Sequence, residues 1–319
     1  MSDTKRVHKP TRLLPLLCLG TASLLLAACA QEASAPASSA AAAASTAPAA
    51  SAEGAASAAA SAEASAPALD ECAPENLTTL EPGKLVIGTD SPAYPPYFID
   101  DDPANGQGFE SAVAYAVAEG LGFAPSDVTW TVVPFNSSYA PGDKEFDFDI
   151  NQISITPERA EVVDFSDGYY TVNQAVIALK DSPIADATAV SDLKGANLGA
   201  QVGTTSLDFI QTVVQPDNKA QVFNDTNDAK SAMNNGQIDG LVVDLPTAYY
   251  ITAVEIPEAT IVGQFAAQEG GEQFGMLFQK GNPLVGCVNK VLADLSASGQ
   301  LQAIQDEWMA GTTAPYFKE

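Results

Sequence analysis

The alternation of short apolar runs with helix patterns constrains this chain more than any other feature of its sequence. From residue 85 onward, runs rich in β-branched and aromatic residues recur at short intervals. We predict strands at residues 85–89, 128–135, 148–155, 174–180, 197–202, 221–223, 240–245, 260–265 and 274–280. We predict helices between several of them, at residues 110–121, 206–214, 228–235 and 284–295. This order favours α/β lobes built on largely parallel sheets.

The first 28 residues carry a secretory signal pattern. Four basic residues within positions 5–12 precede an apolar run at 13–26, and small residues follow it. Residues 26–29, Leu-Ala-Ala-Cys, resemble the lipobox of bacterial lipoproteins. Cys29 is therefore predicted to carry a lipid that anchors an extracytoplasmic protein to the outer face of the cell membrane. The alternative is an ordinary signal peptide that contains a cysteine.

A tract without core-forming residues follows the signal. Residues 30–68 are almost entirely Ala, Ser, Pro and Glu, with no aromatic and no branched aliphatic side chain. Such a composition cannot bury enough apolar surface to fold. We predict that residues 29–69 form an Ala/Ser/Pro-rich linker between the membrane and the folded part.

Charge and residue content exclude several classes of function. The chain has a formal net charge of −26, and because the predicted signal holds four basic residues and one acidic residue, the mature chain stands at about −29. This charge disfavours nucleic acid or anionic lipid as a partner. The single histidine, His8, lies in the signal, which excludes Ser-His and Cys-His nucleophiles and imidazole zinc sites. We expect no cofactor, no metal and no catalytic residue.

Two cysteines remain for the folded part. Cys18 leaves with the signal peptide and Cys29 is the predicted lipidation site, so Cys72 and Cys287 remain in an oxidising compartment. We predict that they form a disulfide. Two unrelated buried thiols are the alternative, because the sequence alone does not show that their Cα atoms approach bonding range.

An acidic stretch at residues 100–102 invites a calcium site. If Gly106 is counted as the sixth position of an EF-hand loop, Pro103 takes the third position and Ala112 the twelfth. An EF-hand needs an oxygen ligand at the third and a bidentate Glu at the twelfth. We therefore predict an acidic hairpin with an Asn-Gly turn instead.

Several ordered motifs carry the functional information. The longest is Ile-Asn-Gln-Ile-Ser-Ile-Thr-Pro-Glu-Arg at residues 150–159, with Val-Val-Asp-Phe-Ser at 162–166. The others are Gly-Thr-Asp at 88–90, Tyr-Pro-Pro at 94–96, Gly-Thr-Thr at 203–205 and Val-Asp at 243–244. Together they resemble the amino-acid-binding family 3 of type II periplasmic solute-binding proteins, over about 235 residues. Members serve ABC importers.

The resemblance implies a fold. It is the two-lobed type II periplasmic binding protein fold, in which each lobe has a central, mostly parallel sheet flanked by helices and two hinge strands join the lobes. We expect lobe 1 at residues 70–172 and 271–319, and lobe 2 at residues 173–270.

The resemblance also implies a carboxylate clamp. In the family, the arginine of the Thr-Pro-Glu-Arg motif binds the α-carboxylate of the ligand, and Arg159 occupies that position. A planar, permanently charged guanidinium suits a carboxylate because it donates two parallel hydrogen bonds. A surface ion pair with Glu158 or Glu161 is the alternative. Thr204 and Thr205 open a helix whose backbone N–H groups offer a second carboxylate seat, or they are N-caps without a ligand.

Acidic and aromatic residues complete the predicted site. The resemblance assigns Asp244 to the ligand's ammonium and Asp90 to a further contact, since both end strands that line the cleft. Either carboxylate could instead cap the following helix. Tyr94 and Phe135 match aromatic positions that sandwich the ligand, although each alone suits a core. One extra residue within 91–93 separates Asp90 from Tyr94 relative to the usual spacing.

Two glutamines bear on specificity. Gln152 stands where many relatives have a small residue, and Gln201 stands where some binders of polar ligands have a lysine. Their amides donate and accept hydrogen bonds, so an aliphatic ligand would leave them unpaired. We therefore expect a polar amino acid, glutamine or glutamate.

The predicted mechanism is hinge closure of a monomer. Lobe 1 contributes Ser154 beside Asp90 and Arg159, lobe 2 contributes Gln201, Thr205 and Asp244, and the closed form is read by the ABC permease. The alternative is a periplasmic lyase of the cyclohexadienyl dehydratase type on the same fold. A third possibility is a sensory lobe, which would accompany a transmembrane helix or a lytic domain.

Overall fold

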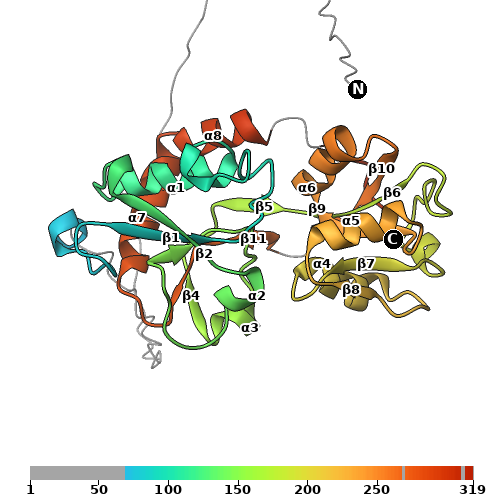
Figure 1. Cartoon of the computed structure of the whole chain (residues 1–319), viewed down its shortest axis with the longest axis horizontal. Helices are drawn as coiled ribbons and strands as arrows, with labels where there is room; N and C mark the ends of the chain where they lie inside the picture. Colours follow the sequence, from blue (N-terminus) through green and yellow to red (C-terminus); the bar gives the residue numbers. More distant parts are fainter. Residues whose placement is uncertain (1–68, 268–269, 310–312, 319) are drawn as a thin grey trace, which may run out of the picture. The chain divides into compact units, whose positions relative to one another are not determined.

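The computed structural model describes residues 69–267, 270–309 and 313–318 (Figure 1). The predicted signal peptide, the lipidation site at Cys29 and most of the predicted linker lie outside these residues. No helix of the described part is long and apolar enough to cross a membrane.

The first sheet has the strand order β2-β1-β3-β12-β4. Its strands are β1 (Leu85–Thr89), β2 (Val128–Val132), β3 (Phe148–Asp149), β4 (Val163–Phe165) and β12 (Leu277–Gln279). β1 runs parallel to β2 and β3, whereas β12 runs antiparallel to β3 and β4. One strand is therefore reversed in an otherwise parallel sheet, which we call lobe 1 together with its helices.

The second sheet repeats this plan in the order β10-β6-β9-β7-β8. Its strands are β6 (Gln174–Leu179), β7 (Leu198–Gln201), β8 (Gln221–Phe223), β9 (Gly240–Asp244) and β10 (Ala259–Gln264). β6 alone runs antiparallel to its neighbours β9 and β10. This sheet and its helices form lobe 2, so the predicted pair of mostly parallel sheets is confirmed.

Two short strands connect the lobes. β5 (Tyr170–Val172) precedes β6, and β11 (Glu272–Phe274) follows β10. They pair antiparallel with each other, and Figure 1 shows them between the two larger sheets. The chain passes from one lobe to the other through this pair, as expected for two hinge strands.

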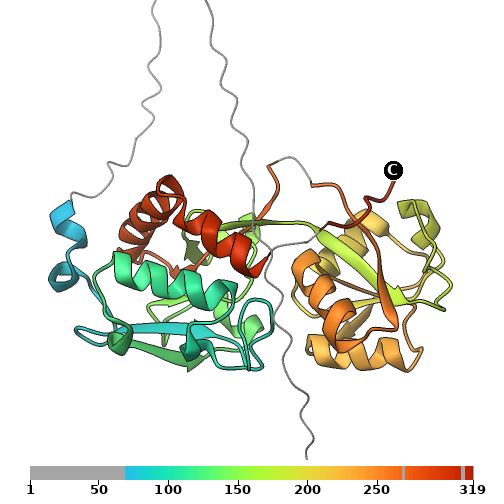
Figure 2. The same cartoon turned by 90° about the horizontal axis from the view of Figure 1, so that it is seen from above.

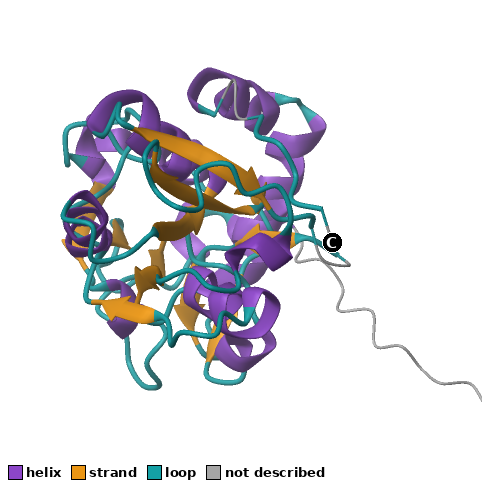
Figure 3. Ribbon diagram, turned by 90° about the vertical axis from the view of Figure 1, so that its right-hand side faces the viewer, coloured by secondary structure: helices purple, strands orange, loops and turns teal. Residues whose placement is uncertain are grey.

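Helices pack on the sheets because the strands carry apolar side chains on both of their faces. In β6, Val176 and Ala178 join one core cluster while Ala175 and Ile177 join another, since successive strand residues point to opposite faces. Figure 3 shows the helices outside the strands. The α-helices are α1 (Phe109–Gly120), α2 (Phe135–Ser138), α3 (Pro157–Ala160), α4 (Thr205–Phe209), α5 (Thr226–Asn234), α6 (Leu245–Tyr250), α7 (Leu284–Ala297) and α8 (Gln300–Trp308).

In lobe 1, α1, α7 and α8 pack against one another (Figure 2). Gly108 is the N-cap of α1; its φ of 98° suits glycine, and a Cβ at this position would stand 2.4 Å from the carbonyl oxygen of Tyr97. This close approach sets the first turn of α1, with Glu110, deep in the lobe.

Short helices complete the fold: 3₁₀ turns η1 (Leu69–Cys72), η2 (Pro74–Asn76), η3 (Pro103–Asn105), η4 (Pro125–Asp127) and η5 (Val190–Leu193), and π turns η6 (Ile210–Val214) and η7 (Ile251–Glu255).

Some predicted elements differ from the structure. The strand predicted at 128–135 ends at Val132, and Phe135 begins α2. The strand predicted at 148–155 keeps only Phe148–Asp149. The helix predicted at 206–214 begins as α4 and continues as the π turn η6. α8 was not expected from the pattern.

The acidic hairpin prediction is wrong. Residues 103–105 form the turn η3, which begins at a proline and is capped by the Asp102 carboxylate accepting from the Ala104 N–H. Asp101 instead accepts a hydrogen bond from the Ala93 N–H at 2.6 Å. The acidic residues therefore serve local backbone donors, which is a common role of aspartate in turns.

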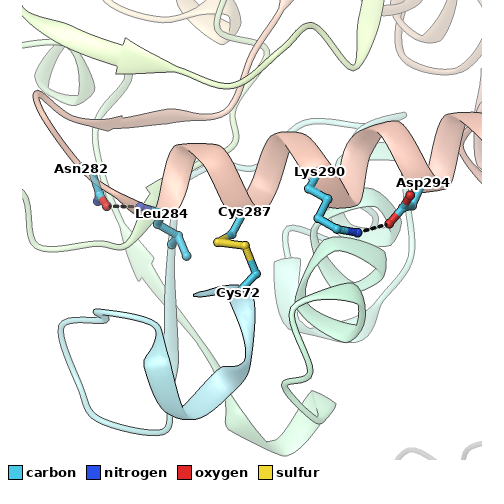
Figure 4. The surroundings of a disulfide bond; sticks show 6 residues. All are labelled: Cys72, Asn282, Leu284, Cys287, Lys290 and Asp294. Carbon is cyan, nitrogen blue, oxygen red and sulfur yellow. Dashed lines mark hydrogen bonds and ion pairs between the residues drawn. A yellow bond between two sulfur atoms is a disulfide. The ribbon is translucent and has the colours of Figure 1, made fainter. Parts of the chain in front are cut away.

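The predicted disulfide is present (Figure 4). Cys72 in η1 is bonded to Cys287 in α7, with their Cα atoms 5.4 Å apart. Cys287 is buried in the core of lobe 1. The bond attaches the segment before β1 to the C-terminal helices across 215 residues of sequence.

Candidate ligand-binding site

One cavity is lined by residues of both lobes. Lobe 1 contributes Asp90, Tyr94, Phe135, Asn151 and Gln152. Lobe 2 contributes Gln201, Thr204, Thr205, Ser206, Thr226, Val242, Val243, Asp244 and Thr247. The cavity lies where β1, β7 and β9 end, as ligand crevices do in open α/β sheets.

Most of the residues predicted from the sequence meet at this cavity. Those that line it are Asp90, Tyr94, Phe135, Gln152, Gln201, Thr204, Thr205 and Asp244. Ser154 and Arg159 do not line it. They lie behind its wall, because the Ser154 hydroxyl is 3.4 Å from that of Thr205 and the Arg159 guanidinium is 5.5 Å from the ring of Phe135.

Arg159 bridges the two lobes. Its guanidinium donates to the backbone oxygen of Ser154 at 2.7 Å and to that of Gly203 at 2.9 Å. The rings of Phe135 and Tyr139 lie over it at 5.5 and 4.8 Å. Arg159 is 8% exposed, and this burial lowers its pKa. The alternative of a surface ion pair with a neighbouring glutamate does not describe this buried cation.

A carboxylate from the connecting strands lies beside Arg159. Glu272 accepts hydrogen bonds from the hydroxyls of Ser154 at 2.5 Å and Thr205 at 2.6 Å. The Gln174 amide donates to Glu272 at 3.1 Å and to Asp244 at 2.6 Å. Hydroxyls of both lobes therefore meet on one acidic side chain of β11.

Asp244 has the larger pKa shift of the two acids that line the cavity. Burial is the largest cause that raises its pKa well above the usual range, and the charge of Glu272 adds to it. The Gln174 amide opposes the shift by donating to the Asp244 carboxylate. This carboxylate would hold its charge best beside a cation.

Asp90 has a different environment. Its carboxylate accepts from the backbone N–H of Ser91 at 2.7 Å and of Phe135 at 3.1 Å. Burial raises its pKa, these two donors lower it, and the charge of Asp225 raises it again. The Asp90 carboxylate therefore accepts hydrogen bonds from backbone groups of its own lobe and still lines the cavity.

Gln152 is held from behind by Glu110. Its backbone N–H donates to the Glu110 carboxylate at 2.7 Å, and its side-chain amide donates to the other carboxylate oxygen. Gln152 has a φ of 49°, a left-handed conformation that costs energy for a residue other than glycine. Burial raises the pKa of Glu110 to about 7.

The lobe 2 side of the cavity has a capped helix. The Thr204 hydroxyl accepts from the Leu207 N–H at 3.2 Å and donates to the Gln201 carbonyl at 2.8 Å, so Thr204 is the N-cap of α4. The Thr226 hydroxyl donates to the Gln201 side chain at 3.0 Å. The N-cap alternative for Thr204 is thus realised, although the residue also faces the cavity.

Other residues on the wall or directly behind it were not identified from the sequence. Asn151 adjoins Gln152 in the same motif, which is the one signal that pointed to it. Glu110 stands in the first turn of a helix, where acids are ordinary, and Glu272 lies in a three-residue strand too short to show a pattern. The remaining unpredicted lining residues are Ser206, Thr226, Val242, Val243 and Thr247. Within the described ranges, no group of three or more His, Cys, Asp or Glu is arranged to hold a metal ion.

Two α/β lobes joined by paired strands, with polar side chains of both lobes around one cavity, define a type II periplasmic binding protein. The chain belongs to the bacterial extracellular solute-binding proteins, family 3, whose sequence model matches residues 85–311.

Individual relatives agree with this assignment. The arginine-binding extracellular protein ArtP of Bacillus subtilis (strain 168) is 28% identical over 250 residues, which cover 76% of this chain and 93% of ArtP. The solved structure of an ancestral arginine-binding protein bound to glutamine is 29% identical to this chain, with a TM-score of 0.61, and the match covers 71% of this chain and 97% of that one.

A further solved structure bears on the lyase alternative. It is the ancestral amino acid-binding protein AncCDT-1, titled a precursor of cyclohexadienyl dehydratase, with 29% identity and a TM-score of 0.59. It covers 71% of this chain and 95% of its own. The family and the curated relatives are binding proteins and not enzymes.

Proposed function

We propose that this protein is the extracytoplasmic solute-binding component of an ABC importer and captures a free polar amino acid by closing its two lobes. The observation that carries the proposal is the pairing of charge around one cavity. A buried guanidinium behind the cavity wall, Arg159, and a carboxylate on the wall, Asp244, come from opposite lobes. A zwitterion satisfies both only when the lobes close, so binding favours the closed form.

The α-carboxylate of the ligand is proposed to bind at Arg159. A guanidinium has five N–H donors, and its bonds to Ser154 and Gly203 leave donors for a carboxylate. The hydroxyls of Ser154 and Thr205 lie beside this position. Asp244 is proposed to accept from the ammonium, which supplies the cation that its buried carboxylate needs.

The side chain of the ligand is proposed to face Asp90, Gln152 and Gln201. Of the two side chains expected from the sequence, glutamine suits these groups better than glutamate, because glutamate would add a carboxylate beside Asp90. The ancestral relative whose structure holds glutamine supports this choice.

A cationic amino acid such as arginine is a second candidate. No lysine or arginine lines the described cavity, whereas Asp90 and Asp244 both do. A cationic side chain would complement Asp90 as the ammonium complements Asp244. ArtP is named for arginine, which agrees with this candidate.

The remaining parts of the proposal concern where the protein works. Cys29 would anchor it to the outer face of the membrane through the linker at residues 29–69, leaving the lobes of a monomer free to reach the permease. The assignment of residues 70–172 and 271–319 to lobe 1, and of 173–270 to lobe 2, stays part of the proposal.

A thermal-shift screen of the chain from residue 30 onward would test the function. The ligands are the twenty amino acids, sugars, polyamines and prephenate. At about a hundred times Kd, linkage adds ~2.7 kcal/mol and raises Tm by several degrees. A rise with glutamine, arginine or another polar amino acid would support the proposal. No response to any amino acid, together with a response to prephenate, would favour the lyase.

Arg159→Ala tests the carboxylate clamp. We expect the affinity for the amino acid identified in the screen to fall by at least about a hundredfold, because truncating one partner of a buried charge pair costs ~3–5 kcal/mol. Calorimetric titration measures this. Glu158→Ala, on the same short helix, is the control and should change Kd by less than about twofold. A loss of about tenfold or less for Arg159→Ala would place the carboxylate elsewhere.

A further inference from the structure

Glu110 is a buried carboxylate with three hydrogen-bond donors and, within the described part of the chain, no cation paired with it. It is 0% exposed. One of its oxygens accepts from the Gln152 backbone N–H and from the Tyr169 hydroxyl, and the other accepts from the Gln152 side-chain amide. Among the described residues, these three donors come from Gln152 and Tyr169, and two of the three belong to Gln152, which lines the cavity.

The contacts constrain which end of the Gln152 amide is available. An amide group has an NH₂ end that donates and a carbonyl end that accepts. Because the NH₂ group of Gln152 donates to an acceptor-only carboxylate, the carbonyl oxygen is the group left to face the cavity. The left-handed backbone of Gln152, with its N–H on the same carboxylate, keeps the side chain in this place.

We propose that Glu110 is a positioning residue whose charge decides which end of the Gln152 amide faces the ligand. With Glu110 ionised, the cavity is offered a carbonyl acceptor. With Glu110 protonated, it is offered an NH₂ donor. The inference rests on the proposed amino-acid-binding function for its consequence in selectivity, and on the described contacts alone for the amide orientation.

Protonation forces the change through a donor conflict. The oxygen that accepts from the Gln152 amide is the one free to carry the proton, because the other already accepts two donors. An O–H group and an NH₂ group cannot bond to each other as donors, so the amide turns to accept the new proton. The NH₂ end then points to the cavity, where it suits carboxylate or carbonyl side chains and opposes guanidinium or ammonium groups.

The pH at which this happens is set by the surroundings of Glu110. Burial raises its pKa to about 7, and the three hydrogen bonds hold it from rising further. The titratable groups that act on Glu110, or on which Glu110 acts, are Tyr169, Tyr97, Asp149 of β3 and Asp244 of β9. Among these groups the Tyr169 hydroxyl favours the ionised form of Glu110 by donating to it, and the Glu110 charge in turn raises the pKa of Asp149 and Asp244.

The first test needs no ligand. The ¹⁵N side-chain resonance of Gln152 is followed by NMR between about pH 6 and about pH 8, on either side of the pKa of about 7 to which burial raises Glu110. We expect it to titrate near pH 7 in the wild type and in Glu119→Gln, an exposed position on the same helix. In Glu110→Gln, which keeps the shape and presents a permanent NH₂ donor, the resonance should not titrate. A resonance that titrates equally in Glu110→Gln, or stays constant in the wild type, would overturn the proposal.

The second test measures selectivity by calorimetry with L-arginine and L-glutamate. We expect the ratio of arginine to glutamate affinity to be at least about fivefold higher at pH 8 than at pH 6 in the wild type, and unchanged by pH in Glu110→Gln. Asp90 also faces the cavity, so only the part of the pH dependence lost in Glu110→Gln is assigned to Glu110. An equal pH dependence in both proteins would overturn the assignment. If neither the screen nor this titration finds an amino acid that binds, the proposed function fails, while the NMR result still decides the role of Glu110.

Discussion

Two aspartates on opposite walls of the cavity differ in what holds their charge. Asp90, at the end of the lobe 1 strand β1, accepts two backbone N–H groups. Asp244, at the end of the lobe 2 strand β9, has one amide donor and the carboxylate of Glu272 as a neighbour. Burial raises the pKa of both, and raises it well above the usual range for Asp244.

The difference separates a preformed contact from one that a ligand completes. Backbone donors at Asp90 are present whether or not the lobes close, because they belong to the same lobe. The charges of Glu272 and Glu110 raise the pKa of Asp244, and the opposing charge of Arg159 is the smallest of the causes that act on it. An ammonium group beside Asp244 would therefore offset the cost of its burial and hold it ionised. We infer that the affinity for the ligand depends more on Asp244, on the lobe 2 wall, than on Asp90.

Asp244→Asn is expected to have the largest effect. The variant keeps the shape but loses the charge, so binding of the amino acid found in the screen should weaken by about 10²–10³-fold. Calorimetric titration beside Asp239→Asn, a carboxylate outside the cavity wall, measures the loss. A change of about threefold or less would show that the ammonium binds elsewhere.

The same variant should be more stable without ligand. Because the pKa of Asp244 is raised in the folded protein, the native state keeps a proton there at pH values at which the unfolded chain has lost it. The free energy of unfolding therefore falls as pH rises above about 4. Asn removes that loss. The Tm of Asp244→Asn should therefore exceed that of the wild type at pH 8 and match it near pH 4. A lower Tm for Asp244→Asn than for the wild type at pH 8 would show that the folded protein stabilises the ionised carboxylate of Asp244.

Asp90→Asn should have a smaller and ligand-dependent effect. The amide keeps an oxygen acceptor for the N–H groups of Ser91 and Phe135, so the wall is retained. We expect the affinity to fall by about tenfold for L-arginine and by a few-fold for L-glutamine. Removing the charge of the acceptor weakens its hydrogen bond to a cationic side chain more than its hydrogen bond to a neutral one. Equal losses for the two ligands would mean that Asp90 does not face the side chain of the ligand.

The sequence predicted where Asp90 and Asp244 lie but not how their surroundings differ. Both aspartates were expected at the cleft because each ends an apolar strand, a pattern visible in Leu85–Thr89 and Gly240–Asp244. The features that distinguish them were not visible. The Phe135 N–H reaches Asp90 from 45 residues away, and Glu272 reaches Ser154 from 118 residues away. Contacts of this range depend on how the strands are ordered in the sheets, which no local pattern encodes.

The same limit explains the misassigned elements. The strand predicted at 128–135 contains Pro134, which has no N–H to donate to a sheet and is the N-cap of α2; the strand ends at Val132, and Phe135 lies beside Arg159. Asp100 and Asp101 take left-handed backbone angles that replace the expected hairpin. Strong periodicity over many residues, as in α1 and α7, was predicted well because it depends on the helix alone.

The disulfide gives the smallest expected effect on binding and the sharpest control for the two walls. Cys72 and Cys287 join η1 to α7 in lobe 1, and neither lines the cavity. Replacing both by Ser removes a constraint across 215 residues and should lower stability by about 2–5 kcal/mol. Thermal unfolding should show this loss, while Kd for the bound amino acid stays within about twofold. A large change in Kd would mean that the stability of lobe 1, and not only the charge at Asp244, governs ligand capture.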